Sequence, residues 1–438
     1  MEHAFTEKSL RSSQMYLIQN VKTFQDVILQ SSKDGKDWSQ PFNMSQWSTY
    51  LNYDIMGDLV FGRRFDLMTS DSHRFVARLI MNSTAFIYTV SPVGIKNARP
   101  SEYTDCQQFA SLPLKALSRR ILSSGILSLP IIGGNMATDD KRFFQYAEGI
   151  LGERIAAKGK GAEARNDIMH HLLQATDPVT GKGFSREQLN VESSLLIAAG
   201  ADTTSVTLAA TFYYLLHNPS VMHKLMGEVR SAYTSDKMDQ ITPAKLVSLP
   251  YLRAVIDEAL RLSPPVPSLL PREVLKGGIT IDGQHIPAGT IVGVSAYAIH
   301  RNPEYFPEPN VFYPERWIVS ESDTKDSSSP NIPRTRQAIS IARQAFSSFS
   351  QGARGCIGRQ LAYYELHTAL ALTLHRFEIR LSQIEDSTDW REGFPDVIDP
   401  IRGKENKTQG WRKEGEFQLY DRFLSDRNGP MVEFRERV

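Results

Sequence analysis

The sequence predicts a mainly α-helical fold with a small β region, an α+β protein, from two patterns. Through most of residues 1–263, apolar side chains recur every three or four positions, as they do on one face of a helix. After Pro264-Pro265 the segments become short and β-branched, and Asp282-Gly283 between two of them is typical of a hairpin turn. No internal repeat is found, and we expect residues 1–438 to form a single domain.

The expected helices of the first part of the chain follow in order. They run from about Thr6 to Gln30, from about Trp47 to Leu59 before Gly62, from about Arg74, from about Asp139, from about Arg165, and from Ser185 to His217. Ser185 with Gln188 three residues later indicates a capping box at the start of the long helix. Asn218 is expected to cap the next helix, with Pro219 at its first position.

The second part of the chain is expected to hold short strands and one more long helix. The expected strands cover Gly278 to Asp282, Gln284 to Ile286 and Thr290 to Val294, and a helix runs from about Ile357 to His375. Gly415 to Tyr420 and Pro430 to Phe434, separated by Arg427-Asn428-Gly429, are expected to form a terminal hairpin. Ser320 to Thr335 and much of Gln383 to Glu414 are rich in polar residues and are expected to be loops.

The composition excludes several classes of protein. With 41% hydrophobic and 23% charged residues, the chain can bury enough apolar surface to fold, so it is globular and not disordered. Fifty Lys and Arg against 49 Asp and Glu leave a net charge of +1, and we expect no nucleic-acid partner. Two cysteines, Cys106 and Cys356, exclude a disulfide framework and a four-cysteine metal site.

Membrane-spanning and targeting segments are not expected in this sequence. No apolar stretch follows Met1, which predicts neither a signal peptide nor an N-terminal anchor. Residues 189–216 are the most apolar segment, but Glu192 and Asp202 lie inside it, and a charge near the centre of a membrane helix is costly. We therefore expect a buried helix here.

Cys356 lies in a glycine-rich loop directly before an apolar helical pattern, which suits a metal ligand. A helix N-terminus favours thiolate over thiol through its unpaired N–H groups and dipole, while Gly358 would let a flat ligand approach the helix. A buried cysteine in an ordinary tight turn is the alternative. A dinucleotide-binding loop is excluded because Gly352, Gly355 and Gly358 do not have the spacing of Gly-x-Gly-x-x-Gly.

The ten residues around this cysteine resemble the haem-ligand signature of the cytochrome P-450 monooxygenases. Every fixed position matches in Phe349-x-x-Gly352-x-Arg354-x-Cys356-x-Gly358. The resemblance implies a cytochrome P-450 fold and a haem cofactor with the Cys356 thiolate as its axial iron ligand. Phe349 and Gly358 would then line the haem site, and Arg354 would pair with a haem propionate.

A second motif, Glu258-Ala259-Leu260-Arg261, places an acid and a base on one helix face. By itself this pair is typical of a solvated helix surface. It also resembles the Glu-x-x-Arg of the same family, which implies a buried structural network with a downstream arginine, here Arg316. A carboxylate between two guanidiniums can be fully hydrogen-bonded, which is the condition for burying such charges.

A third motif, Ala199 to Thr204, lies midway along the long apolar helix. A polar patch facing water is the alternative interpretation. The motif resembles the family's oxygen-activation segment, where the helix is locally opened beside haem and a threonine hydroxyl bonds its own helix carbonyls. By this resemblance Ala199 and Gly200 leave room for O2 and substrate, and Asp202 and Thr203 deliver protons.

Three further residues are interpreted individually. Arg272 falls where the family carries a second propionate-binding arginine, although a surface arginine is the alternative. Residues 266–270 resemble the segment that lines the substrate pocket, which implies an apolar small-molecule substrate. His300 is expected to be a structural turn histidine, and Cys106 a bystander thiol.

The resemblance covers the whole chain but begins inside the family's pattern. We therefore expect the fold to be incomplete at its N-terminus, with an exposed apolar edge at Thr290 to Val294, poor solubility and weak haem retention. The family implies the endoplasmic reticulum membrane as the location, and we expect membrane association only if a longer N-terminus restores the anchor.

The resemblance implies a haem-thiolate monooxygenase that oxidises a hydrophobic small molecule. Residues 53–62 are similar to fungal members that serve secondary metabolism, and terpenoid, polyketide and alkaloid substrates remain open. The implied partners are O2 and an NADPH-dependent reductase. Two alternatives remain: a family member that rearranges its substrate without O2, and a truncated, inactive haem-fold protein.

Overall fold

The computed structural model describes most of the chain. The described residues are 2–32, 37–77, 79, 136–157, 165, 167–177, 179–233, 243–320, 332–383, 415–422 and 424–437. Cys106, most of the helix expected from Arg74, and most of the two expected loops lie outside these residues.

The fold is mainly helical, as the sequence predicts. The α-helices are α1 (Glu7–Ser12), α2 (Gln14–Ser31), α3 (Met44–Phe61), α9 (Met136–Ala157), α10 (Ile168–Gln174), α11 (Arg186–His217), α12 (Pro219–Ala232), α13 (Pro243–Leu246), α14 (Pro250–Leu262), α15 (Ala296–Ile299), α16 (Arg336–Ala345) and α17 (Arg359–Arg376). Short 3-10 helices are η1 (Glu2–Phe5), η2 (Asp71–His73), η6 (Pro314–Trp317) and η7 (Gly352–Arg354).

The strands are short and pair antiparallel. They are β1 (Phe42–Asn43), β2 (Arg272–Glu273), β3 (Ile279–Ile281), β4 (Gln284–Ile286), β5 (Ile291–Val292), β6 (Phe377–Leu381), β7 (Leu419–Arg422), β8 (Leu424–Arg427) and β9 (Met431–Glu436). Three of them form a sheet in the order β1-β9-β6, and the other pairs are β2-β5, β3-β4 and β7-β8.

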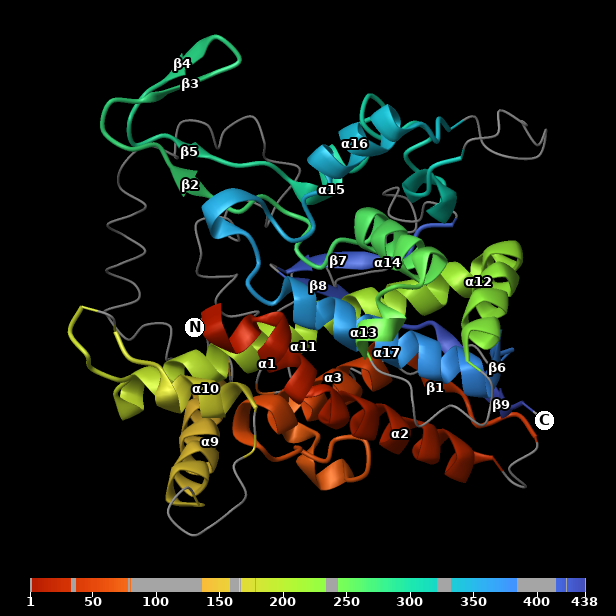
Figure 1. Ribbon diagram of the computed structural model, residues 1–438, viewed down its shortest axis with the longest axis horizontal. Coiled ribbons are helices and arrows are strands. Elements are labelled where there is room, and N and C mark those ends of the chain that lie inside the picture. The colour runs from red at the N-terminus through yellow and green to blue at the C-terminus, as the bar shows by residue number, and fades with distance from the viewer. Residues whose placement is uncertain are drawn as a thin grey trace.

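The long helix α11 is the centre of the helical body. It packs along α3 and also contacts α9, α14 and α17 (Figure 1). Among the described residues, α11 is the one helix that is long and apolar enough to cross a membrane. Yet 72% of its most apolar stretch is buried inside the protein. The expected buried helix is thus observed, and its capping box is present: Gln188 N–H donates to Ser185 Oγ at 3.2 Å, and Ser185 N–H donates to Gln188 Oε1 at 2.8 Å.

The helix expected from Thr6 to Gln30 is divided at Ser13. This residue ends α1, and its N–H donates to carbonyls of the preceding turn. The Ser12 hydroxyl donates to the Ser9 carbonyl at 2.6 Å, and Ser13 Oγ reaches the same oxygen at 3.4 Å. Serine hydroxyls compete in this way with the helical hydrogen bonds, which explains the break. Asn218 does precede α12, but its side chain donates to the Tyr214 carbonyl at 2.8 Å and does not cap the new helix.

The two predicted hairpins have different outcomes. The turn at Asp282-Gly283 joins β3 to β4, with both residues at positive φ. The terminal hairpin is wrong: β7 pairs with β8, while β9 lies between β1 and β6. In this central position β9 buries Phe434 against the rings of Phe24, Phe42 and Phe377. Burial against distant parts of the chain therefore decides the pairing, and no local pattern reports it.

The β2–β5 region and the β3–β4 hairpin project from the helical body as an arm (Figure 1). Several apolar side chains of this arm are open to solvent, with Leu275 81% and Val294 66% exposed, whereas Val274 is buried. The exposed apolar surface expected near Thr290 to Val294 is present in the described structure.

Candidate functional site

The glycine-rich loop holds Cys356 between η7 and α17. The Cys356 N–H donates to the Phe349 carbonyl at 2.8 Å, which closes the loop. Ser350 and Gly352 have positive φ angles of 57° and 67°, the conformation for which glycine is favoured at the second position. The residue after the loop therefore begins a helix whose N-terminus adjoins the thiol, as the sequence predicts.

The thiol of Cys356 is chemically available. The residue is exposed and forms no disulfide. Desolvation within the loop raises the pKa of the thiol, while hydrogen bonds from the backbone N–H groups of Gly358 and Arg359 and the charge of Arg359 lower it. The N–H groups at the helix N-terminus favour the thiolate, as the sequence predicts, but desolvation outweighs them in the protein alone and the net pKa is raised.

Open space adjoins the cysteine on the α17 side. A Cβ placed on Gly358 would meet only the Cys356 sulfur, at 3.9 Å. Among the residues that the structure describes, no packing contact demands glycine here, and a side chain at this position would project beside the sulfur. Space beside the thiol is what a flat ligand bound through sulfur requires.

Two other residues of the signature are placed differently. The Phe349 ring packs against Tyr363 of α17 with 5.2 Å between centroids, and the Arg359 guanidinium lies 5.6 Å from its centre. Arg354 ends η7 with its side chain exposed. Arg272 begins β2 on the projecting arm, where it is exposed and donates to the Pro271 carbonyl at 3.0 Å. Within the described residues, no hydrogen bond or ion pair joins Arg272 to the cysteine loop.

The middle of α11 presents an open side on an otherwise buried helix. Val191, Leu195 and Ala199 recur every four residues and are exposed, and Thr203 continues the same line half-buried. The Thr203 hydroxyl donates to the Ala199 carbonyl at 2.8 Å, as predicted for this segment. The helix is continuous from Arg186 to His217, so this hydrogen bond is made without a break in α11.

Gly200 has a different role from the one expected. A Cβ at this position would lie 2.6 Å from the Met56 methyl carbon of α3. The small residue therefore lets α3 approach α11 and does not clear room for O2. Ala199 is the member of this pair that faces the open side.

Helix α17 carries a buried acid that faces the middle of α11. Burial raises the pKa of Glu365 to about 8, and an interaction with the Thr204 side chain partly offsets this effect. Thr204 follows Thr203 directly, and Glu365 is nine positions after Cys356 in the sequence. The segment Ala199–Thr204 therefore lies against the helix that begins at the cysteine loop.

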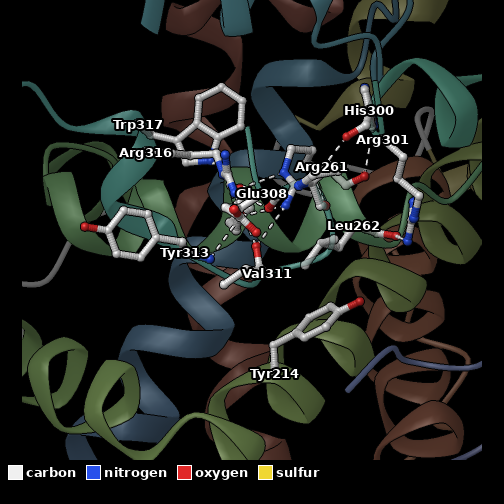
Figure 2. Close-up of polar contacts among 12 residues, drawn as sticks. Tyr214, Arg261, Leu262, His300, Arg301, Glu308, Val311, Tyr313, Arg316 and Trp317 are labelled. Atoms are coloured by element: carbon white, nitrogen blue, oxygen red, sulfur yellow. Dashed lines mark hydrogen bonds and ion pairs between the residues drawn. The ribbon is translucent and has the colours of Figure 1, made fainter. Parts of the chain in front are cut away.

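Glu258, Arg261 and Arg316 form one buried network. Glu258 Oε1 accepts from Arg261 at 2.8 Å and from Arg316 at 2.8 Å, and Oε2 accepts from Arg261 Nε at 2.9 Å. Figure 2 shows the side chains of Arg261, Arg316 and Trp317 close together. The Glu258 carboxylate also accepts from the Trp317 indole at 2.9 Å and from the Tyr313 N–H at 3.0 Å. The solvated-pair alternative is excluded, since Glu258 and Arg261 are fully buried.

The remaining guanidinium hydrogens of the network bind backbone carbonyls. Arg261 donates to the carbonyls of His300, Pro309 and Val311, and Arg316 to those of Pro307, Glu308 and Val311. Burial alone raises the pKa of Glu258, but the two arginine charges and the hydrogen bonds outweigh it and lower the pKa to about 2. The network thus fixes the 300–317 segment on α14 as a stable ion cluster.

His300 has a structural environment, as expected. Its Nδ1 lies 3.0 Å from the Arg261 carbonyl, and its Nε2 accepts from the Ser347 N–H at 2.9 Å. These partners require neutral imidazole with the proton on Nδ1, and burial lowers the pKa of His300 to about 3. The ring stacks on Phe346 and connects the 300–317 segment to the segment that precedes the cysteine loop.

A second polar cluster, around Asp202, was not found from the sequence. Arg427 at the end of β8 is buried and donates to Thr49 of α3 at 3.0 Å and to Ser205 of α11 at 2.5 Å. Burial raises the pKa of Tyr53 well above its usual value, the neighbouring Asp202 raises it further, and Arg427 lowers it. The sequence places Arg427 in a turn between strands, and its neighbours Ser425, Asp426 and Asn428 give no local signal of burial.

Known proteins resemble this chain over most of its length. The cytochrome P-450 family model matches residues 122–402. A cytochrome P-450 monooxygenase of Gibberella zeae is 32% identical over 100% of this chain and 88% of its own length. The cytochrome P-450 monooxygenase AKT7 of Alternaria alternata is 31% identical over 99% of this chain and 73% of its own.

Solved structures agree on the fold. The crystal structure of the cytochrome P-450DA haem domain matches with a TM-score of 0.67 and 21% identity, covering 100% of this chain and 76% of that one.

Proposed function

This chain belongs to the cytochrome P-450 family and is a monooxygenase of that family, and from this premise we propose that it oxidises a hydrophobic small molecule in a fungal secondary-metabolite pathway. The observation that carries the proposal is the juxtaposition of two segments. The exposed Cys356 precedes α17, and the Ala199–Thr204 segment of α11 lies against that same helix through Thr204 and Glu365. A thiol and an open helix face are thereby held on one rigid pair of helices.

The family implies a haem cofactor, and the residues present fit one. Cys356 offers a solvent-accessible sulfur, Gly358 leaves space beside it, and Ala199 presents only a methyl group on the open side of α11. We assign Cys356 as the axial ligand, with Phe349 against the loop and the exposed Arg354 and Arg272 available to haem propionates. Thiolate-bound haem supplies the activation of O2.

Asp202 and Thr203 are proposed to supply protons at this site. The Thr203 hydroxyl donates to a carbonyl of its own helix, so its oxygen remains able to accept a hydrogen bond on the open side. Asp202 is buried one residue earlier and is a carboxylate suited to relay protons. Glu258, Arg261 and Arg316 keep a structural role, since their groups are saturated by one another and by the backbone.

Family membership also supports a substrate class, a redox partner and a location for this chain. The exposed stripe of Val191, Leu195 and Ala199 supports an apolar substrate, with terpenoid, polyketide and alkaloid scaffolds equally open. An enzyme of this family needs O2 and a redox partner, and we propose an NADPH-dependent reductase for this chain. We propose the endoplasmic reticulum membrane as its location.

The test is haem binding by the purified chain and by two cysteine variants. Wild type, reduced under carbon monoxide, is expected to give the band of thiolate-bound haem, and Cys356→Ser is expected to lose it. Cys106→Ser is the matched control, because it removes the other cysteine of the sequence and should keep the band. A wild-type chain without the band, or a Cys356→Ser variant that retains it, would refute the assignment.

Turnover tests the reaction class. With a reductase, NADPH and O2, wild type is expected to convert an apolar probe such as 7-ethoxycoumarin or a member of a terpenoid and polyketide panel. Thr203→Ala is expected to consume NADPH while forming less product. Equal product from wild type without NADPH and O2 would instead indicate a rearrangement.

A further inference from the structure

Arg427 is a charged residue in an interior position. It ends β8 with 4% of its surface exposed, and its guanidinium reaches two helices. One nitrogen donates to Thr49 Oγ1 of α3 and Ser205 Oγ of α11, and the other donates to the Ser425 carbonyl at 3.2 Å. A guanidinium keeps its charge at any pH relevant to proteins, so a fixed positive charge lies between α3 and α11.

This charge lies on the same side of α11 as Asp202. Ser205, which accepts from Arg427, donates in turn to the Asp202 carbonyl at 2.8 Å. Asp202 and Ser205 are three positions apart, so their side chains lie on neighbouring parts of one helix face. Tyr53 of α3 is within electrostatic reach of both the Asp202 carboxylate and the Arg427 guanidinium. Asp202, Arg427 and Tyr53 therefore form one buried cluster.

We propose that Arg427 is a positioning residue for Asp202, holding its turn of α11 through Ser205 and keeping its buried carboxylate ionised and oriented. The inference rests on the proposed function, in which Asp202 relays protons. A buried carboxylate otherwise takes up a proton, because the charged form is costly away from water, and a nearby opposite charge lowers its pKa by about 1–3 units. A cation at this place would therefore let Asp202 cycle between its two protonation states near neutral pH.

Two other titratable groups of the described residues face this part of α11, and neither carries a positive charge. From α3, Tyr53 faces Asp202 as a neutral phenol, which can donate a hydrogen bond to the carboxylate but carries no positive charge. From α17, Glu365 faces Thr204, two positions further along α11, and its pKa of about 8 keeps it largely neutral at neutral pH, so it supplies no positive charge. Arg427 is the cation that the described contacts bring to this face.

The first experiment measures the protonation of Asp202 directly, without turnover. Infrared spectra of the haem-loaded chain are recorded with isotope-labelled aspartate between pH 5 and 9, and the Asp202 carboxyl band is assigned by its loss in Asp202→Asn. Arg427→Gln is expected to raise the titration of this band by at least about one pH unit. Arg427→Lys, which keeps a charge, is expected to stay closer to wild type. Arg435→Gln on β9 is the control for removal of an arginine elsewhere.

The second experiment connects this shift to the reaction. Product formed per NADPH is measured with 7-ethoxycoumarin over the same pH range. Arg427→Gln is expected to lower this ratio about five-fold or more and to move the pH profile in the direction of the infrared shift. In an Asp202→Asn background, Arg427→Gln should have no further effect, because a residue that acts only through Asp202 has nothing left to act on.

The haem spectrum separates failure of this inference from failure of the proposed function. If wild type binds thiolate-bound haem and forms product, the proposed function stands whatever Arg427 does. An unchanged Asp202 titration in Arg427→Gln then overturns the inference. The inference is also overturned if both Arg427→Gln and Arg427→Lys lose haem while the haem that remains bound forms product at the normal rate. Ser205→Ala tests the link if Arg427→Gln does not fold: a wild-type Asp202 titration and wild-type product per NADPH in that variant also overturn it.

Discussion

Glu258 and Arg316 are 58 positions apart in the sequence, yet the Arg316 Nε lies 2.8 Å from Glu258 Oε1 in the interior of the protein. Arg261, one turn beyond Glu258 on α14, binds both oxygens of the same carboxylate. Because each guanidinium also donates to backbone carbonyls of residues 300–311, the ion cluster anchors a segment that has little regular structure.

Replacing Glu258 by Gln should unfold or severely weaken the chain. The change leaves two buried guanidiniums with no compensating negative charge, which costs about 3–5 kcal/mol. Urea unfolding of the haem-loaded protein measures the loss. Glu304→Gln is the matched control, because Glu304 is exposed and its change should stay within about 0.5 kcal/mol. A Glu258→Gln variant as stable as that control would contradict a stabilising role for the cluster.

The same carboxylate predicts an acid-labile fold. The folded pKa of about 2 lies below the usual value of 4.5, so the unfolded chain takes up a proton before the folded one does. The stability that Glu258 contributes is therefore complete above about pH 4.5 and is lost as pH falls toward 2, amounting to roughly 3 kcal/mol. Urea midpoints measured from pH 6 down to 3 should fall along this curve, and a flat profile for wild type would be inconsistent with it.

Local spacing predicts only part of this cluster. Glu258 and Arg261 are recognisable as one helix face because they are three positions apart, but the same spacing occurs on solvated helices. The partner Arg316 could be named only through the family resemblance, and the Trp317 indole and Tyr313 N–H that complete the carboxylate were not predicted. Contacts between segments far apart in sequence leave no periodic signal.

Local spacing predicts the cysteine loop, but it does not predict the polar cluster around Asp202. The placement of Cys356 in a loop directly before a helix could be predicted, because the glycines and the start of the helical pattern stand at fixed local spacing. The contact of Arg427 with Ser205 spans 222 positions, and the residue's turn-like neighbours indicated a hairpin that does not form. Gly200 was recognised as a required small residue, but its reason, Met56 of another helix, is tertiary.

Glu365 should give the free energy of unfolding a pH dependence opposite to that of Glu258. Its folded pKa of about 8 exceeds the usual 4.5, so the stability that the protonated acid allows is present below about pH 4.5 and is lost as pH rises toward 8. Glu365→Gln, which has the shape of the protonated acid, should be more stable than wild type by roughly 2–4 kcal/mol at pH 8 and equal to it near pH 4. Urea unfolding at both pH values checks this, and a Gln variant that is less stable at pH 8 would show that ionised Glu365 has a compensating partner.

Gly200 and Gly227 should respond to the same substitution with opposite signs. Both lie inside helices, where alanine in place of glycine gains about 0.5–1 kcal/mol if nothing obstructs the new methyl group. Around Gly227 of α12 no atom of the described residues lies within 4 Å of a Cβ, so Gly227→Ala should stabilise the chain. At Gly200 the Cβ would lie 2.6 Å from the Met56 methyl carbon, so Gly200→Ala must displace that side chain and should cost about 1–3 kcal/mol. Adding Met56→Ala should recover part of the loss that Gly200→Ala causes, because the crowding and the cavity partly cancel. Thermal or urea unfolding of Gly227→Ala, Gly200→Ala, Met56→Ala and the Gly200→Ala/Met56→Ala double variant measures these differences. Equal stabilisation by both glycine substitutions would mean that α3 and α11 are packed less closely at Gly200 than the structure shows.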